Sequence, residues 1–492
     1  MSSGEVVIVG AGFSGLATSA LLGKQGFDVT VVEKNEQPGG RASVWEKDGF
    51  IFDMGPSWYL MPDVFERFFA EFGKKPDDLM ELKRLDPSYR VFYGPNDTLD
   101  IAADLEKNLA VFEKMEENGA QKMKDYLASA QHQYNVAMDQ FIYKDYVHLT
   151  DFFNRKLIVE GTKLHIFDKL DHYAQRFFSD PRIRKVLEYN IVFLGGTPYN
   201  TPALYALMSH VDFNLGVWYP MGGMGRLVDA MAHLARSQGV EFRFNEPVKK
   251  IEVDGKKARK VITEKGEISA DYIVVNADYA YAETNFLENK HQTYPKKYWE
   301  GKAIAPSALL FYLGLNKKVE GLLHHNLYFH PQWENHFTSI FDKPAWPAEP
   351  SYYVSCTSKT DDSVAPEDGE NIFILVPVAP GLKDSPETRE RYYDQILSHL
   401  ENLLGENIRD SVVVKRSFAH NDFSERYNAY KGTALGFAHT LRQTAIFRPR
   451  HRSKKVKNLY YTGHYTHPGI GVPMVIISSH ILSDEIGRDH AK

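Results

Sequence analysis

The sequence contains a single cysteine, Cys356, among its 492 residues. An intrachain disulfide and a C-x-x-C redox pair are therefore excluded, which fits a reducing compartment. The chain also lacks any run of about 18 apolar residues, so no transmembrane helix is expected. A strand-like run begins at Glu5 and leaves no room for a signal peptide. We expect a cytoplasmic protein. Attachment to a membrane surface stays open, because it requires neither a transmembrane helix nor a signal peptide.

An excess of basic residues is also absent. Lys and Arg number 58 against 64 Asp and Glu, and the net charge of −6 argues against nucleic acid as the main partner. The length exceeds the roughly 250–300 residues at which one hydrophobic core usually divides, so two or more domains are expected. Aromatic residues make up 13% of the chain, which favours broad apolar linings inside the protein.

A glycine-rich turn between two strand-like runs stands at the start of the chain. Residues 5–9 read as a buried parallel strand, residues 16–22 have helix composition, and residues 28–32 read as a second strand. Between the first strand and the helix stands Gly10-Ala-Gly12-Phe13-Ser14-Gly15, and Glu33 follows the second strand. This is the order of a dinucleotide-binding βαβ unit, although an isolated glycine-rich turn is a weak signal.

Each part of this unit has a physical role. Gly10 permits a tight turn, Gly12 lets the backbone approach a pyrophosphate, and Gly15 lets the helix pack closely. The helix N-terminus offers unpaired N–H groups to phosphate. Glu33 can accept hydrogen bonds from a ribose diol, and its charge would repel a 2′-phosphate. We predict an adenine dinucleotide at these residues: Gly10, Gly12, Phe13, Ser14, Gly15, Glu33 and Lys34.

A second glycine pair, Gly39-Gly40, is followed at once by Arg41. Such a pair suits close backbone approach to the middle of an extended dinucleotide, and the guanidinium fork grips phosphate well. The alternative is a solvent-exposed turn. We predict that Gly40 and Arg41 extend the dinucleotide site.

These motifs together resemble the FAD-binding start of the amine oxidase and carotenoid desaturase superfamily. The following segment, residues 49–58, resembles the "FD-GP" segment of phytoene-type desaturases. The resemblance implies that the segment passes beside a flavin and that four of its residues contact it: Gly55, Pro56, Ser57 and Trp58. Without the resemblance, the glycine and proline indicate only a backbone turn.

Two later segments extend the resemblance over nearly the whole chain. Pro220-Met-Gly222-Gly223 resembles the re-entry into the FAD domain, which implies that Val248 lies beside the adenine. The strand at 271–275 ends at Asn276 and Asp278, where ligands lie in such sheets.

The C-terminal segment resembles the phytoene desaturase signature through Thr466-His467-Pro468-Gly469, after a strand that ends at Gly463. A helix beginning near residue 472 would present its positive N-terminus to the flavin. The expected contacts here are Gly463, Gly471, Val472, Pro473 and Met474. The sequence departs from many members of the family at His464 and Tyr465, which leaves the identity of the carotenoid and of the reacting bond open.

The fold class expected is α/β, with a Rossmann-like FAD-binding domain and an interleaved α+β substrate-binding domain. We expect the FAD-binding domain at 1–82, 221–300 and 430–492. The substrate-binding and membrane-facing domain would comprise 83–220 and 301–429. Residues 63–220 read largely as helices, and their amphipathic faces suit a core or a lipid surface. Expected helices cover 62–72, 106–136 with a break near Gly119, 151–172 and 181–194.

The function implied is FAD-dependent carotenoid desaturation, in which an apolar tunnel holds the substrate and no metal takes part. His467 is the expected proton acceptor because it lies in the motif at the flavin, and its alternative role is that of a structural histidine. The basic run 448–457 suits a solvated face or the docking of the protein on anionic lipid. The expected partners are a carotenoid and a membrane surface, to which the cytoplasmic protein would attach peripherally.

Several alternatives stay open. Within the desaturase family, phytoene desaturation competes with 3,4-desaturation of a 1-hydroxycarotenoid. An amine oxidase would need a compact amine site and matches the C-terminal motif poorly. A carotenoid isomerase or saturase would use the flavin without net oxidation of its substrate. A binding role without catalysis would leave the flavin unused.

Overall fold

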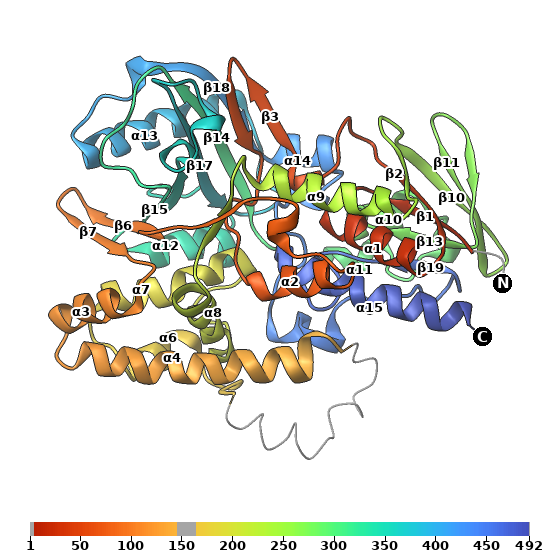
Figure 1. Ribbon diagram of the computed structural model, residues 1–492, viewed down its shortest axis with the longest axis horizontal. Coiled ribbons are helices and arrows are strands. Elements are labelled where there is room, and N and C mark those ends of the chain that lie inside the picture. Colours follow the sequence, from red (N-terminus) through yellow and green to blue (C-terminus); the bar gives the residue numbers. More distant parts are fainter. Residues whose placement is uncertain (1–3, 145–163, 492) are drawn as a thin grey trace.

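A five-stranded parallel sheet forms one end of the molecule in a computed structural model that describes residues 4–144 and 164–491 (Figure 1). Its strand order is β19-β13-β1-β2-β9, and every neighbouring pair is parallel. The strands are β1 (Glu5–Val9), β2 (Asp28–Val32), β9 (Glu241–Arg243), β13 (Tyr272–Val275) and β19 (Leu459–Tyr461). The predicted βαβ start is confirmed, and strands from the middle and the end of the chain complete the sheet.

Helices pack around this sheet, and the chain termini lie at the same end of the molecule (Figure 1). The first helix, α1, contacts both α9 and α15. The helices are α1 (Phe13–Lys24), α2 (Pro62–Ala70), α9 (Met224–Ser237), α10 (Tyr279–Asn285), α11 (Lys296–Glu300) and α15 (Val472–His490). A small antiparallel sheet of β10 (Val248–Asp254), β11 (Lys257–Thr263) and β12 (Glu267–Ser269) lies beside them.

A seven-stranded mixed sheet forms the other part of the molecule, with the order β18-β14-β17-β16-β15-β6-β7. Its strands are β6 (Tyr89–Gly94), β7 (Asp97–Ile101), β14 (Ser307–Leu315), β15 (His325–Tyr328), β16 (Tyr352–Ser355), β17 (Glu370–Val378) and β18 (Val412–Phe418). Helices α12 (Trp333–Phe337), α13 (Pro386–Leu404) and α14 (His420–Tyr427) accompany it. β14 is buried along its whole length because both of its neighbours are hydrogen-bonded and both faces are covered.

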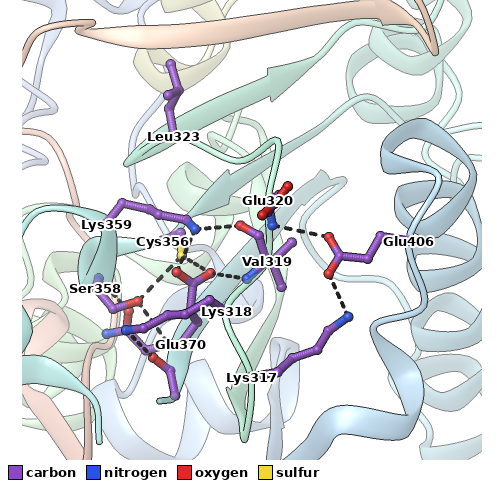
Figure 2. Close-up of polar contacts among 12 residues, drawn as sticks. Lys317, Lys318, Val319, Glu320, Leu323, Cys356, Ser358, Lys359, Glu370 and Glu406 are labelled. Carbon is purple, nitrogen blue, oxygen red and sulfur yellow. Dashed lines mark hydrogen bonds and ion pairs between the residues drawn. The ribbon is translucent and has the colours of Figure 1, made fainter. Parts of the chain in front are cut away.

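A partly buried ion pair lies at the start of β17, an inner strand of this sheet (Figure 2). Lys359 Nζ lies 2.7 Å from Glu370 Oε1, and the backbone N–H of Val319 donates to Glu370 Oε2 at 3.0 Å. The thiol of Cys356 points to the same carboxylate at 3.4 Å. Burial raises the pKa of this thiol, so the single cysteine belongs to the packing of the sheet.

A layer of helices lies below the seven-stranded sheet in the view of Figure 1. It contains α3 (Leu105–Met115), α4 (Gly119–Val136), α6 (Leu170–Gln175), α7 (Pro181–Glu188) and α8 (Leu207–His210). The predicted break near Gly119 is confirmed, since a Cβ there would lie 2.1 Å from the carbonyl oxygen of Phe112. The predicted helix 181–194 is regular to Glu188 and continues as a 3₁₀ turn.

Two sequence predictions concern this region. The prediction of a largely helical stretch 63–220 needs correction, and the predicted helix 151–172 lies mostly outside the described residues. The stretch 63–220 begins in the predicted helix α2, but it is not helical at 82–101, where β5 (Leu82–Arg84), β6 and β7 stand. β6 and β7 form a local hairpin, whereas β5 and β6 also pair with distant partners, β8 (Trp218–Pro220) and β15. Most of the predicted helix 151–172 falls outside the described residues, and the described part becomes helical only at Leu170.

The hairpin of β3 (Val44–Lys47) and β4 (Phe50–Asp53) connects the two parts of the molecule. Phe50 and Phe52 belong to the same hydrophobic core as Tyr312 of the seven-stranded sheet. Within residues 4–144 and 164–491, no helix combines the length and apolar character needed to cross a membrane.

Candidate functional site

A single cavity of about 1200 Å³ connects the end of the parallel sheet with the seven-stranded sheet. Its dinucleotide-like part is lined by predicted residues from the first strands and from β10 and β13: Gly10, Gly12, Phe13, Ser14, Glu33, Lys34, Gly40, Arg41, Val248, Asn276 and Asp278. The other predicted residues line the same cavity further along: Gly55, Pro56, Ser57, Trp58, Gly463, His467, Gly471, Val472, Pro473 and Met474. The structure therefore brings together residues separated by more than 400 positions in the sequence.

Gly15 is the predicted residue that does not line the cavity. A Cβ at this position would lie 2.1 Å from the carbonyl oxygen of Gly10 and 2.7 Å from Asn276 Nδ2. Asn276 Nδ2 donates a hydrogen bond to that carbonyl at 3.2 Å. Gly15 thus serves the close packing of α1 on the turn, as the sequence predicts, and Asn276 fixes the turn from the neighbouring strand.

Glu33 is held in place at the end of β2. Its carboxylate accepts hydrogen bonds from the backbone N–H groups of Ala11 and Asn35, both at 2.8 Å. The side chain is 5% exposed, and burial raises its pKa. The position at the edge of the cavity suits a contact with ribose hydroxyl groups.

Arg41 presents an unsatisfied donor near the glycine turns. Its Nε is buried without a hydrogen-bond partner, while Nη2 donates to the carbonyl oxygen of Thr433 at 3.3 Å. The guanidinium also lies 5.7 Å from the ring centre of Tyr427. A buried donor without a partner is costly, and a phosphate oxygen would satisfy it. The residues in this part of the cavity therefore fit a dinucleotide.

Lys34 and Ser14 direct their side chains to protein groups. Lys34 Nζ donates to the carbonyl oxygen of Glu425 and, at 3.1 Å, to Asn428 Oδ1. The hydroxyl of Ser14 lies 2.6 Å from that of Thr462 and 2.9 Å from that of Ser479. At both positions a ligand contact would come from the backbone or the aliphatic stem.

Asp278 connects the cavity wall with Tyr465. The carboxylate accepts from the backbone N–H of Tyr281 at 3.0 Å, which caps α10, and from the Tyr465 hydroxyl at 2.8 Å. Burial raises the pKa of Asp278. Tyr465 therefore has a hydrogen-bond partner within the protein, and the residue is buried at 2% exposure.

The 55–58 segment runs between the two parts of the cavity. A Cβ at Gly55 would lie 2.4 Å from the carbonyl oxygen of Arg41, so the two glycine-containing turns touch. The indole of Trp58 stacks on the imidazole of His325 with ring centres 4.1 Å apart and an interplanar angle of 7°. This stack holds the segment against β15 of the seven-stranded sheet.

His467 has a defined tautomer. Its Nε2 lies 3.2 Å from the carbonyl oxygen of Phe141 and 3.1 Å from that of Ile142. Carbonyl oxygens only accept, so Nε2 carries hydrogen and any proton taken up would go to Nδ1. The contact also ties the C-terminal motif to the residues that follow α4, which is the structural role considered above.

His439 and Tyr205 are site residues that sequence reasoning missed. His439 Nε2 accepts from the backbone N–H of Ile470 at 3.0 Å, so its hydrogen stands on Nδ1 and points to the Tyr205 hydroxyl at 2.9 Å. Burial lowers the pKa of His439 well below its ordinary value. Both residues line the cavity, and neither stands in a recognisable motif.

The basic run 448–457 is not one solvated face. Arg448 is 3% exposed, whereas Lys454, Lys455 and Lys457 are exposed. Arg452 pairs with Asp489 and lies 3.7 Å from Glu485. The predicted solvated face therefore agrees with these three lysines and is wrong for Arg448, whose guanidinium donates to backbone carbonyl oxygens of the C-terminal motif.

Comparison with known proteins identifies related chains. A family model described as flavin containing amine oxidoreductase matches residues 13–486. A carotenoid 3,4-desaturase of Haloarcula japonica is 46% identical over 100% of this chain and 99% of its own length. A zeta-carotene-forming phytoene desaturase of Myxococcus xanthus is 33% identical over 98% of this chain and 93% of its own.

Solved structures share the fold. An oxidoreductase from Methanosarcina mazei has a TM-score of 0.64 at 17% identity and covers 98% of this chain and 100% of its own. Putrescine oxidase bound to putrescine has a TM-score of 0.60 at 15% identity, with 99% of each chain covered. At these identities the likeness concerns the fold alone, and it agrees with the expected α/β class.

Proposed function

Because this chain belongs to the family of flavin-containing amine oxidoreductases, we propose that it is an FAD-dependent carotenoid desaturase. The observation that carries the proposal is the continuous cavity, which has dinucleotide-binding features at one end and apolar walls elsewhere. The relatives named as carotenoid 3,4-desaturase and phytoene desaturase support this choice of substrate class.

FAD is the proposed form of the flavin, and NADP is disfavoured. The Glu33 carboxylate would accept hydrogen bonds from the adenosine ribose and would repel a 2′-phosphate. The unpaired Nε of Arg41 would donate a hydrogen bond to the pyrophosphate. The start of α15 would face the flavin with its positive end. When bound, the flavin supplies a hydride acceptor.

The substrate part of the cavity favours a long hydrocarbon. Its walls include apolar side chains from the helical layer and from the seven-stranded sheet: Phe193, Leu194, Leu204, Met208, Leu310 and Leu375. Burial of such surface is worth about 25 cal/mol for each Å² of apolar area, so shape and area would select a polyene. An amine oxidase would need a compact polar pocket, which this lining does not favour.

The first relative favours 3,4-desaturation over phytoene desaturation as the particular reaction. We propose that residues of this chain orient the polyene, exclude water and accept the proton released from the carbon next to the hydride donor. His467 is the proposed acceptor through Nδ1, because Nε2 is engaged with the carbonyl groups of Phe141 and Ile142. A purely structural role for His467 is the competing proposal.

We also propose the domain division 1–82, 221–300 and 430–492 for FAD, with 83–220 and 301–429 for substrate. Membrane attachment would bring the insoluble substrate to the cavity. Phe167 supports this proposal, since it lines the cavity and is 94% exposed, which is unusual for a phenylalanine.

The decisive experiment is anaerobic incubation of the FAD-loaded protein with carotenoids in liposomes, followed by product analysis. A desaturase bleaches the flavin absorbance in a single turnover and yields a product with one more double bond. An isomerase or saturase would leave the oxidised flavin unbleached by the same substrate, and an amine oxidase would bleach only with amines.

A further inference from the structure

Arg448 is a buried cation without a buried anion. The residue is 3% exposed, and among residues 4–144 and 164–491 its guanidinium donates only to backbone carbonyl oxygens. The acceptors belong to Phe437 (3.1 Å), Gln443 (3.3 Å), His464 (2.6 Å), Tyr465 (3.2 Å) and Thr466 (3.0 Å). In the described part of the chain, Arg448 forms no ion pair with a carboxylate, and the ring centre of Phe437 lies 5.3 Å away.

This arrangement is energetically unusual. Buried charges in proteins are normally paired with an opposite charge. The free energy lost when a charge leaves water is larger than the free energy gained from hydrogen bonds to neutral carbonyl groups. Asp278, a buried carboxyl group in the same wall, does not serve Arg448: it accepts from Tyr465 and responds to the charge of Arg41. The positive field of Arg448 is instead felt by the neutral histidines His439 and His464.

The position of the charge relates it to the cofactor. Three of its five acceptors are the carbonyl groups of residues 464–466, and the neighbouring Gly463, His464 and His467 line the cavity. The guanidinium therefore lies directly behind the wall formed by the C-terminal motif. The helix that starts at Val472 adds its positive end to the same wall.

We propose that Arg448 is the fixed positive charge that stabilises the reduced, anionic flavin ring through this wall. The inference rests on the flavin of the proposed function. Hydride transfer brings two electrons and one proton to a ring that is neutral when oxidised, so the ring gains one negative charge. The second proton leaves the neighbouring carbon for a base or water and does not involve Arg448. A cation held in a region of low dielectric favours that added charge.

The alternative is that Arg448 only fastens the 464–466 segment. The reduction potential of the flavin separates the two roles. A residue that only holds the 464–466 segment in place would not stabilise the negative charge of the reduced ring. Arg448→Gln removes the charge and keeps donors, and Arg448→Lys keeps the charge and loses the fork. Arg452→Gln is the matched control, since Arg452 is partly exposed and already paired with carboxylates.

The experiment uses the FAD-loaded protein and titrates it with sulfite, which adds to the flavin with a gain of negative charge and bleaches its absorbance. We expect Arg448→Gln to weaken sulfite binding at least tenfold and to lower the two-electron potential by about 30 mV for each tenfold change. Arg448→Lys should stay within threefold of wild type, as should Arg452→Gln. The readout needs no carotenoid, so failure of the proposed substrate leaves it valid.

A second variant covers the case in which Arg448→Gln does not retain flavin. Gln443→Glu adds a carboxylate on a residue whose backbone carbonyl accepts from Arg448, but it also removes the hydrogen bonds that Gln443 Nε2 donates to the carbonyl oxygens of Ala303 and Ala438. Gln443→Leu loses the same bonds without adding charge and is the control. Relative to Gln443→Leu, Gln443→Glu should weaken sulfite binding in the same direction. Equal weakening by Arg448→Lys and Arg448→Gln, or equal sulfite affinity in Gln443→Glu and Gln443→Leu, would overturn the proposal and leave Arg448 a fastener.

Discussion

The hydroxyl of Tyr465 donates a hydrogen bond to Asp278 Oδ2 at 2.8 Å and joins the C-terminal motif to the end of β13. The two residues are 187 positions apart in the chain and face each other in the buried wall of the cavity. Asp278 also caps α10, so this hydrogen bond connects the start of α10, the end of β13 and the C-terminal motif. Tyr465 itself does not line the cavity.

Tyr465→Phe should loosen this wall. The substitution removes one donor from a buried carboxyl group, which costs about 1–3 kcal/mol when the acceptor stays unsatisfied. We expect a lower apparent Tm and weaker FAD binding in fluorescence titration. Asp278→Asn in the Tyr465→Phe background should then cost less than it does alone. Additive losses would contradict the coupling.

Gly15 and Gly12 should respond differently to alanine. A Cβ at Gly15 would lie 2.1 Å from a backbone oxygen, so Gly15→Ala should lower the Tm of the apoprotein by several degrees. A Cβ at Gly12 would lie 3.2 Å from the side-chain atom Asn276 Nδ2 and 4.0 Å from the carbonyl oxygen of Gly39, and Gly12 lines the cavity, so Gly12→Ala should keep the apoprotein Tm. Its effect should appear in FAD affinity, as a loss of tenfold or more. Equal Tm losses in the two apoproteins would refute this division of roles.

The stability of the protein should carry a pH signature from Asp53. Its carboxylate accepts from the N–H groups of Met224 and Gly225 at the start of α9, yet burial raises its pKa from 3.8 to about 6. Because its pKa is raised in the folded state, the contribution of Asp53 to the free energy of unfolding is complete below pH 3.8 and is lost as the pH rises through 6. The Tm of Asp53→Asn minus that of wild type should therefore increase over this window and stay constant above it. A difference that does not change with pH would disprove the assignment.

His467→Gln tests the proposed proton acceptor. Glutamine can still donate to the carbonyl groups of Phe141 and Ile142 but cannot accept the proton. We expect anaerobic flavin reduction by carotenoid to slow by about 100-fold or more, the usual scale for loss of a general base. Flavin content and carotenoid binding should stay near wild type. Loss of FAD from the variant would show that His467 has a structural role. An unchanged rate of flavin reduction would show that another group accepts the proton.

Membrane attachment can be tested by flotation with anionic liposomes. We expect the wild type to float, and Phe167→Ser to float less because an exposed aromatic anchor is removed. Replacing Lys454, Lys455 and Lys457 together by Gln should reduce flotation only at low salt. Val413→Ser is the control, since Val413 is also exposed and does not line the cavity. A wild type that stays unbound on every lipid mixture tested would refute attachment.

The sequence predicts those parts of the molecule that depend on neighbours in the chain. The strand, turn and helix around Gly10 and Gly12 are local, so the glycines and the β-branched runs suffice to locate them. The predicted site residues line one cavity, apart from Gly15, because the motifs stand at strand ends and helix starts. Their role in binding FAD stays a prediction.

The features missed in the sequence depend on distant partners. The strands at 82–101 carry short mixed patterns, and β5 and β6 take their distant partners from β8 and β15. Arg448 stands in a run of cations that normally indicates solvent, and only the fold reveals the carbonyl groups that surround it. His439 and Tyr205 come together across 234 positions, for which a single sequence offers no signal.

The hydroxyl of Ser14 meets Thr462 and Ser479, which lie 448 and 465 positions later in the chain. During synthesis at roughly 5–20 residues per second, the first helix must therefore wait for tens of seconds until its partners leave the ribosome. Late in that interval β1 already has its partners β2 and β13 and α1 already has α9, but β13 lacks β19 and α1 lacks α15. A ribosome that stops before residue 459 releases a chain without β19 or α15, in which the cofactor pocket cannot close.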